Sequence, residues 1–511
     1  MSNLNSFVHA AVIDSLDKSQ GSGLGELFWR RLLYIGLERT INLCDSVFEP
    51  SDVDSVLTIP RNFEDLRTLL SDTSTLDQAC YDIFIRKCSL DKMMGAQAIE
   101  QVTMPTKQGF FKRVAKKTTN SIAKKFSNTV LVGCYLNRRQ VLSLVYSSSF
   151  KILPFSIERT ETTFVYDRNL RRSFYDKLVD YTTGSDYGEA AAQYFVFLAV
   201  FLPMDYLEGF DANFDRYSSE SKEFRGLNYL VSEAWISNSE ISFFAAVSCL
   251  YGAKFVCVEH NGPTIYFKDS NVELLQPISD IYLTQGWKSE DSSITKSSSW
   301  WTGYRPVSFK TKVYDCTYFA APAYLRRSMN SDMYFFQGAG AAKYLENQLQ
   351  FFSNLERTVS AKINFRISPI VKEKPYLFQS NIEELSNFNI RIDDLAVKSG
   401  REVIAKSRIV IFDYLSTGYF ESFLAETPTL VLCDRTLIEF SPSYSEIIDR
   451  LFEAKIFHDN PVELAKEYSE AIEDPTLWWN KEKSALALEF ARTFVDPSDL
   501  YRKQLLELSN A

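Results

Sequence analysis

Residues 406–432 read KSRIVIFDYLSTGYFESFLAETPTLVL and predict one complete unit of strand, loop, helix and strand. The short apolar and partly β-branched run 409–412 is bounded by polar residues, which is typical of a parallel strand buried on both faces. Ser416 or Thr417 can cap the helix, and Pro428 ends it before the next predicted strand. Repetition of such units builds a parallel sheet covered by helices, so this stretch predicts an α/β fold.

The start of this helix is a candidate phosphate site. Free backbone N–H groups, two hydroxyls and the positive end of the helix dipole meet there, at the carboxyl end of a strand. Glu421 follows one turn into the helix, where its carboxylate can accept hydrogen bonds from ribose hydroxyls. Most such helix starts in α/β proteins hold only water, so this stretch by itself leaves ligand binding open.

Composition excludes several classes of function. With 511 residues, 45% of them hydrophobic, the chain can bury enough apolar surface for two or three domains. A net charge of −9 argues against a general nucleic-acid-binding protein, because such proteins present a basic surface. The eight cysteines include no CxxC pair and there are three histidines, which argues against a disulfide framework, a zinc site or a histidine-rich metal centre.

The N-terminus carries acidic residues and no apolar core of signal-peptide length. The most apolar run, 190–204, contains Gln193 and Pro203 and is too short to span a bilayer. A cytoplasmic protein is therefore expected. Residues 105–128 contain seven lysines and arginines, no acidic residue and an apolar stripe at helical spacing. This segment either makes peripheral contact with anionic lipid on the inner face of the cytoplasmic membrane or forms a solvated helix face.

The rest of the chain predicts two successive α/β halves. Strands are expected at 130–136, 227–231, 254–258, 312–320, 361–367 and 389–392, besides 409–412 and 429–432 in the opening stretch, and residues 280–287 are expected to form one more strand and a turn. The Ser-rich stretch after 288 breaks the periodicity and indicates a linker. The expected parts are a helical region at 1–128, a first α/β domain at 129–288, a linker at 289–311 and a second α/β domain with C-terminal helices at 312–511.

Polar side chains follow two of these strands. The strand 254–258 runs into Glu259, His260, Asn261 and Gly262, at the position where open α/β sheets bind ligands. A histidine there suits general acid/base work or, as the alternative, caps a loop. Arg366 ends another strand, where its guanidinium can clamp a phosphate or carboxylate, or pair at the surface.

Several collinear segments together resemble a family of transferases encoded in bacterial surface-carbohydrate loci, distantly similar to the capsule Kdo transferases and the polyol-phosphate transferases. The segments are LFWRRLLYIGLE, TLDQACYDIFIRK, LPMDYLEGF, ISFFAAVSCLYGAKFVCVEHNGP, SDIYLTQGW, INFRISP and the Asp-x-x-Ser-Thr-x-x-x-Glu pattern that begins at Asp413. The resemblance implies a GT-B fold, in which two Rossmann-like halves face a cleft, with the acceptor on the first half and the donor nucleotide on the second.

The resemblance also implies roles for individual residues. The donor side would comprise Asp413, Ser416, Thr417, Gly418, Glu421 and Arg366, with Ser416 and Thr417 on the donor phosphate and Glu421 on the ribose. His260 would face the reacting centre, with Asn261, Gly262 and Trp287 on the acceptor side. The family usually has Gln-His-Gly-Gly where this chain has Glu259-His260-Asn261-Gly262, a change that can retune the histidine or mark an inactive copy.

The chemistry that fits is group transfer without a metal or other cofactor, since no DxD pair stands at a predicted strand end. His260 is the first candidate for the base, and Glu208 and Glu259 are the alternatives. The leading hypothesis is a glycosyltransferase that moves a sugar from a nucleotide donor, such as a CMP-activated acidic sugar, to a surface polysaccharide or lipid-linked acceptor. The alternatives are a CDP-polyol phosphotransferase on the same fold and a catalytically degenerate scaffold of a polysaccharide assembly.

Overall fold

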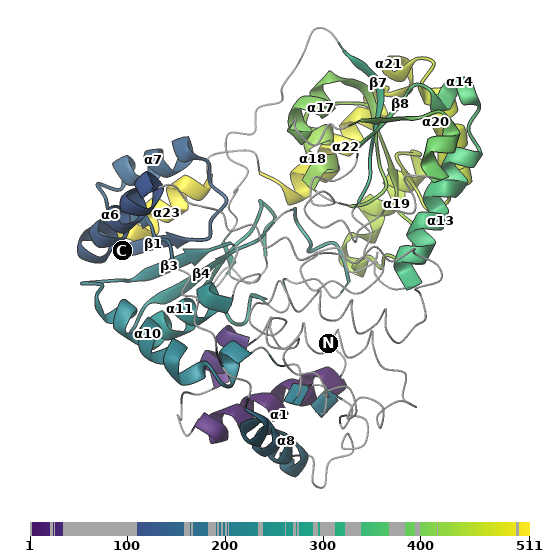
Figure 1. Ribbon diagram of the computed structural model, residues 1–511. Helices are drawn as coiled ribbons and strands as arrows, with labels where there is room; N and C mark the ends of the chain where they lie inside the picture. The colour runs from purple at the N-terminus through teal and green to yellow at the C-terminus, as the bar shows by residue number, and fades with distance from the viewer. Residues whose placement is uncertain are drawn as a thin grey trace.

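The computed structural model contains two six-stranded parallel sheets, each covered by helices on both faces (Figure 1). It describes residues 3–20, 24, 26–33, 110–157, 164, 167–181, 191, 194–195, 198–199, 202, 204–233, 239–260, 262–268, 272, 275–289, 295–296, 312–321, 339–366, 384–393, 399–415, 417–496 and 500–510. The prediction of two Rossmann-like halves in a GT-B-like α/β protein is confirmed by these two sheets.

The first sheet has the strand order β2-β1-β3-β4-β5-β6. Its strands are β1 Thr129–Val132, β2 Ile152–Pro154, β3 Tyr229–Ser232, β4 Lys254–Val258, β5 Ile281–Leu283 and β6 Thr295–Lys296. One face packs against α6 Phe110–Phe126, α10 Phe210–Lys222 and α11 Ser239–Leu250, and the other against α7 Arg138–Ser147 and α23 Leu500–Asn510.

The second sheet has the strand order β12-β11-β10-β7-β8-β9. Its strands are β7 Tyr314–Phe319, β8 Ile363–Arg366, β9 Arg391–Asp393, β10 Ser407–Phe412, β11 Thr429–Leu432 and β12 Phe457–His458. Helices α13 Ala339–Ser353 and α20 Pro461–Ala471 cover one face, and α17 Gly400–Lys406, α18 Thr417–Leu424 and α22 Lys481–Phe494 cover the other.

The opening stretch lies at the centre of this second sheet. Alternate side chains of β10 point to opposite faces, so Ile409 and Ile411 join one apolar cluster while Val410 and Phe412 join another. This confirms a strand buried on both faces. The next helix, α18, ends before Pro428, as predicted.

Other helices complete the described part of the chain. Near the start, α1 Asn3–Gln20 packs against α8 Arg168–Tyr181. The remaining short or surface helices are η3 Met204–Tyr206, α14 Arg357–Ser360, η5 Ser386–Phe388, η7 Pro442–Tyr444, α19 Ser445–Glu453 and α21 Pro475–Trp478. Among the described residues, no helix combines the length and apolarity needed to cross a bilayer.

Three strands were not anticipated, namely β2, β6 and β12. Each is two or three residues long, too short to show a period of two in the sequence. The strand β6 falls inside the stretch expected to be a linker and pairs with β5 as the edge of the first sheet.

The C-terminal helix also differs from expectation. The sequence grouped it with the second domain, but α23 buries Tyr501, Leu505 and Leu508 against the first sheet (Figure 1, yellow). Ser509 also accepts a hydrogen bond through its backbone carbonyl from Asn128 Nδ2, at 2.8 Å. The end of the chain therefore returns to the first domain.

The two domains meet through a buried aromatic cluster. Tyr419 of α18 donates a hydrogen bond to the hydroxyl of Tyr266, at 2.5 Å, and both side chains are almost completely buried. Tyr266 lies in the loop that follows His260, and its ring lies 5.1 Å from that of Phe494. The loop after β4 is thereby attached to the first turn of α18.

Candidate functional site

His260 and Glu233 form a pair at the carboxyl edge of the first sheet. Glu233 follows β3 and His260 follows β4, which are neighbouring parallel strands. His260 Nδ1 lies 3.2 Å from Glu233 Oε1. The Glu233 side chain is 6% exposed and that of His260 25%, so a buried carboxylate holds an imidazole that reaches the surface. When the carboxylate accepts a hydrogen bond from Nδ1–H, Nε2 carries the lone pair, which is the arrangement of a general base.

The loop after β1 holds Glu233 in place. The backbone N–H of Tyr135 donates to Glu233 Oε2 at 3.0 Å, and the Tyr135 ring lies 5.0 Å from that of His260. Burial beside Glu233 raises the pKa of the Cys134 thiol well above its usual value, so this cysteine is a neutral thiol at physiological pH. Three parallel strands therefore contribute to the surroundings of His260.

Glu259, an alternative base, is directed away from this pair into the protein. Its carboxylate accepts hydrogen bonds from Trp287 Nε1 at 2.8 Å, from the Gln285 backbone N–H at 2.9 Å and from the Thr264 backbone N–H at 3.2 Å. Glu259 is 2% exposed and Trp287 4%. Three donors satisfy the buried charge, which favours a structural role for both side chains.

Gly262 is buried in the loop between Glu259 and Tyr266. Asn261 lies outside the described residues.

Glu208, the other alternative base, forms a buried ion pair. Its two carboxylate oxygens accept from Arg171 Nε at 2.6 Å and from Arg171 Nη2 at 2.7 Å. Both side chains are 3% exposed. The guanidinium occupies both oxygens of this buried carboxylate, so Glu208 is better suited to hold α8 against the segment before α10.

Arg366 and Arg401 both act on Glu421 at the carboxyl edge of the second sheet. Arg401 Nε donates to Glu421 Oε1 at 2.6 Å. Arg366, which ends β8, is 8% exposed, and its guanidinium lies 5.3 Å from the centre of the Phe319 ring. Burial lowers the pKa of Arg366, and burial also raises the pKa of Glu421 although Arg401 and Arg366 act against it. A buried cation of this kind is stabilised by an added anion.

The start of α18 lies next to these arginines, since Glu421 belongs to its second turn. Thr417 begins the helix and is partly exposed. A Cβ on Gly418 would lie 2.6 Å from Phe412 Cε1, so only glycine lets the helix approach β10 this closely. Ser416 lies outside the described residues. Arg366 thus acts on Glu421, and Thr417 and Gly418 lie one turn before Glu421 on the same helix.

Asp413 does not face this group of residues. It is 1% exposed and accepts from Tyr344 Oη at 2.7 Å, Gln348 Nε2 at 2.5 Å and the Ala321 backbone N–H at 3.0 Å. Burial raises the pKa of Asp413 to about 7. Its position ties the end of β7 and helix α13 to the end of β10, which corrects its placement among donor-contacting residues.

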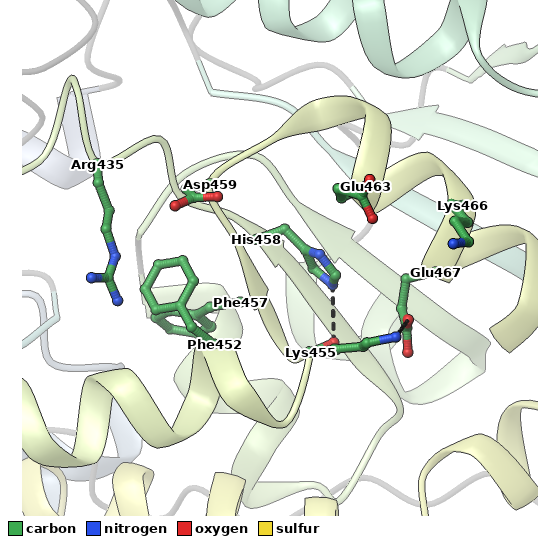
Figure 2. Close-up of a pocket in the computed structure, with 9 residues that line it drawn as sticks. All are labelled: Arg435, Phe452, Lys455, Phe457, His458, Asp459, Glu463, Lys466 and Glu467. Atoms are coloured by element: carbon green, nitrogen blue, oxygen red, sulfur yellow. Dashed lines mark hydrogen bonds and ion pairs between the residues drawn. The ribbon is translucent and has the colours of Figure 1, made fainter.

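A separate pocket of about 290 Å³ opens at the end of β12 (Figure 2). Its lining includes His458 together with charged side chains from α20 and from the segment after β11. Sequence patterns did not predict a site in this region. Within the described part of the chain, no group of three or more histidine, cysteine, aspartate or glutamate side chains is arranged to hold a metal ion.

The family of the chain follows from its sequence. A family model described as LIC12162 family transferase matches residues 50–505. The chain belongs to this family of transferases. That match covers both sheets and all the site residues named above, so it supports the expectation of a transferase enzyme over nearly the whole chain.

No curated protein matches this chain. Solved structures with a similar fold include Acinetobacter baumannii MurG, at 10% identity over 75% of this chain and 99% of MurG, with a TM-score of 0.37. Another is α,α-trehalose 6-phosphate synthase from Burkholderia multivorans, at 10% identity over 75% of this chain and 98% of the synthase, with a TM-score of 0.37. The wall teichoic acid polymerase TagF matches at 11% identity over 78% of this chain and 92% of its own, with a TM-score of 0.34. Likenesses at this level carry no conclusion about the site.

Two residues of this transferase site were missed in the sequence. Glu233 follows a buried strand directly, so the rule that drew attention to His260 would also have found it. Arg401 lies in the first turn of α17, twenty residues before Glu421, and no local signal connects the two.

Proposed function

We propose that this transferase moves a sugar from a nucleotide-activated donor to a hydroxyl group of a saccharide or lipid-linked acceptor. The observation that carries the proposal is the His260–Glu233 pair, with 3.2 Å between Nδ1 and Oε1 at a strand-end position. A buried carboxylate that orients a partly exposed imidazole is typical of an active general base. This pair argues against a catalytically inactive scaffold, because a scaffold would have no need for a carboxylate buried beside His260.

The proposed step uses His260 as the base. Its Nε2 takes the proton of the acceptor hydroxyl while the hydroxyl oxygen forms a bond to the anomeric carbon of the donor sugar. The bond between that carbon and the phosphate oxygen breaks, and the nucleotide leaves with the electron pair. Glu233 stabilises the imidazolium that forms, because its carboxylate is fixed beside Nδ1.

The second sheet supplies the donor side in this proposal. Arg401 pairs with Glu421, Arg366 acts electrostatically on the same carboxylate, and α18 begins one turn earlier. Two guanidinium groups and a helix N-terminus stabilise negative charge that grows on a departing phosphate. The 2.5 Å hydrogen bond between Tyr266 and Tyr419 connects the loop after His260 to this helix, which supports assigning both edges to one reaction.

Calorimetric titration with CMP, CDP, UDP, GDP and TDP tests the donor side. The variants are Arg366→Ala and Arg401→Ala, and the matched control is Arg408→Ala, an exposed arginine at the opposite end of β10. One nucleotide should bind the wild type and the control, and binding should weaken about tenfold or more in each of the two test variants, since a hydrogen bond to a charged group is worth about 1.5–3 kcal/mol. Failure of all five nucleotides to bind would contradict the proposal.

The identity of the donor follows from the same panel and from turnover. Preference for a cytidine nucleotide would support a CMP-linked acidic sugar of the Kdo type, and a UDP, GDP or TDP preference would support an ordinary hexose donor. Incubation with CDP-glycerol and CDP-ribitol forms the contrasting arm. Consumption of either compound with transfer of its polyol phosphate would replace the proposal by phosphotransfer.

For a lipid-linked acceptor, we propose that helix α6 makes peripheral membrane contact. The helix has no acidic residue in its first turn. Phe126 is 67% exposed and Ile122 is 40% exposed. Lys124 is occupied by Glu220 and Glu223, which leaves the exposed Lys125 beside the apolar pair. Sedimentation with phosphatidylglycerol vesicles should capture the wild type and a Leu477→Ser control but not Phe126→Ser. Equal sedimentation of both variants would contradict this contact.

A further inference from the structure

The pocket at the end of β12 is a second polar site in this protein, separate from the proposed transfer site. The strand order places β12 at one edge of the second sheet and β8, which carries Arg366, four strand spacings away. At about 4.8 Å per spacing this is roughly 19 Å. The pocket volume of about 290 Å³ lies near the lower end of the range for small-molecule sites, about 300 Å³.

His458 forms the inner wall of the pocket. It is 8% exposed, and its Nε2 lies 3.0 Å from the backbone carbonyl oxygen of Lys455 (Figure 2). A carbonyl oxygen only accepts, so Nε2 carries the proton and Nδ1 carries the lone pair. Burial lowers the pKa of His458, which keeps the ring neutral. Within the described residues Nδ1 has no hydrogen-bond partner, and the ring lines the pocket.

The fixed charges of the lining are largely neutralised by one another. Lys455 pairs with Glu467 at 3.2 Å, and Arg435 pairs with Asp449 at 2.6 Å while it covers the Phe452 ring at 3.9 Å. Glu467 also accepts from Trp478 Nε1 at 2.7 Å. Each of these cations is thus paired with a carboxylate, which reduces its attraction for an added anion.

Three lining side chains remain available. Asp459, Glu463 and Lys466 make no hydrogen bond or ion pair through their side chains with any other described residue. Together with Nδ1 of His458 they offer several acceptors and one ammonium donor. Two carboxylates against one ammonium disfavour a phosphate or nucleotide, because an anion would be repelled. Vicinal hydroxyl groups match this set, since each hydroxyl can donate to a carboxylate or imidazole nitrogen and accept from an ammonium.

We propose that the pocket at the end of β12 binds a neutral saccharide unit through Asp459, Glu463, Lys466 and Nδ1 of His458. The site is distinct from the proposed transfer site, and it does not require that the proposed function be correct. In a transferase that acts on saccharides, such a pocket would hold a part of the acceptor chain away from the reacting end.

Histidine NMR tests the proposal directly, because the chain contains three histidines, His9, His260 and His458. The full-length protein is labelled at histidine Cε1, and the three signals are assigned with one histidine-to-glutamine variant each. Glucose, galactose, mannose and N-acetylglucosamine are titrated separately, and inorganic phosphate, putrescine and CMP serve as contrasting probes. At least one sugar should shift the His458 signal in a saturable way while the His9 signal stays unchanged.

The variant Glu463→Ala should weaken the sugar-dependent shift about tenfold or more, because it removes a charged acceptor. The matched control is Glu470→Ala, an exposed glutamate on the same helix that does not line the pocket. By calorimetry, His458→Gln should also weaken binding while it retains an N–H donor for the Lys455 carbonyl. Absence of any sugar-dependent shift, or a shift with phosphate or putrescine alone, would overturn the proposal. A shift at His458 without any response of His260 to CMP would count against a cytidine donor and leave the pocket standing.

Discussion

At the scale of single residues, the most informative contact is that between Glu233 and His260. The carboxylate is buried and its second oxygen is held by the Tyr135 backbone N–H, so its position does not depend on a bound substrate. A carboxylate so held orients the imidazole and stabilises its protonated form during proton transfer. The same sheet edge presents Glu259 and Trp287, but these two satisfy each other in the interior.

Replacement of Glu233 by glutamine should lower the turnover number for sugar transfer by about 10²-fold or more, the usual size of a general-base contribution. Glutamine can still accept the Tyr135 N–H, but its amide nitrogen then faces Nδ1 of His260, so the loss would arise from the missing charge and from the reversed tautomer of the imidazole. Initial rates at saturating donor and acceptor measure the effect. Glu473→Gln, an exposed carboxylate on the other domain, is the matched control. An unchanged turnover number in Glu233→Gln would remove His260 from the role of base.

Asp413 should make stability depend on pH. Its pKa is about 7 in the folded protein and about 3.9 in the unfolded chain. Because the folded value is raised, the stabilising contribution is fully present below about pH 4 and is lost as the pH rises through about 7. Between these values the free energy of unfolding should fall by about 1.4 kcal/mol per pH unit on account of this group.

Urea unfolding at pH 5 and pH 6.5 measures this dependence, and the difference between wild type and Asp413→Asn isolates the contribution of the one carboxyl group. The variant carries no titrating group at this position, so it should show a smaller fall between the two values. If the free energy of unfolding changed equally with pH in the two proteins, Asp413 would not titrate in this pH range.

At the scale of elements, helix α18 is positioned by the absence of a side chain at Gly418. Contact between this glycine and the Phe412 ring sets the distance of the helix from β10, and thereby the position of Thr417 and Glu421 relative to Arg366. A one-methyl change in this contact is therefore expected to alter both stability and donor affinity.

The variant Gly418→Ala should cost about 1–3 kcal/mol in free energy of unfolding, the usual price of overpacking, because the new methyl group would overlap the Phe412 ring. It should also weaken binding of the nucleotide identified by titration. Gly226→Ala is the control, since a Cβ at Gly226 would meet nothing within 4 Å. Equal stability of the two variants would show that α18 can shift at little cost.

At the scale of the whole molecule, the domains are connected in two ways. The aromatic cluster around Tyr266 and Tyr419 joins the loop after His260 to the start of α18. In addition, the chain passes from the second domain back to the first, where its last helix, α23, packs against the first sheet. Both connections restrict how far the two carboxyl edges can move apart.

A double-mutant cycle with Tyr266→Phe and Tyr419→Phe measures the first connection. Each single change leaves the partner hydroxyl buried without this hydrogen bond and should cost about 1–3 kcal/mol in free energy of unfolding. The double variant should lose less than the sum, with a coupling energy of at least about 0.5 kcal/mol. Additive losses would show that the two hydroxyls act independently.

Local sequence patterns determined the α/β class and most of the strands. The runs at β4 and β11 were predicted with their observed limits, because a continuous apolar run bounded by polar or turn residues reports burial on both faces without reference to the rest of the chain. The same patterns placed Arg366 at the end of one strand and Thr417 at the start of a helix that follows another, and parallel topology puts both at the carboxyl edge of one sheet.

Tertiary structure alone decided which side chains meet. Glu233 and His260 are 27 residues apart, and Arg401 and Glu421 are 20 apart, so their contacts depend on strand order and on helix packing. Glu208, Glu259 and Asp413 stood at positions typical of a site, yet packing turned each carboxylate toward buried donors. Helix α23, near the end of the chain, packs against the strands of the first sheet, which are distant in sequence. The physical reason is that propensity and periodicity report the burial of a residue, whereas its partner is set by long-range packing of segments that the local sequence does not encode.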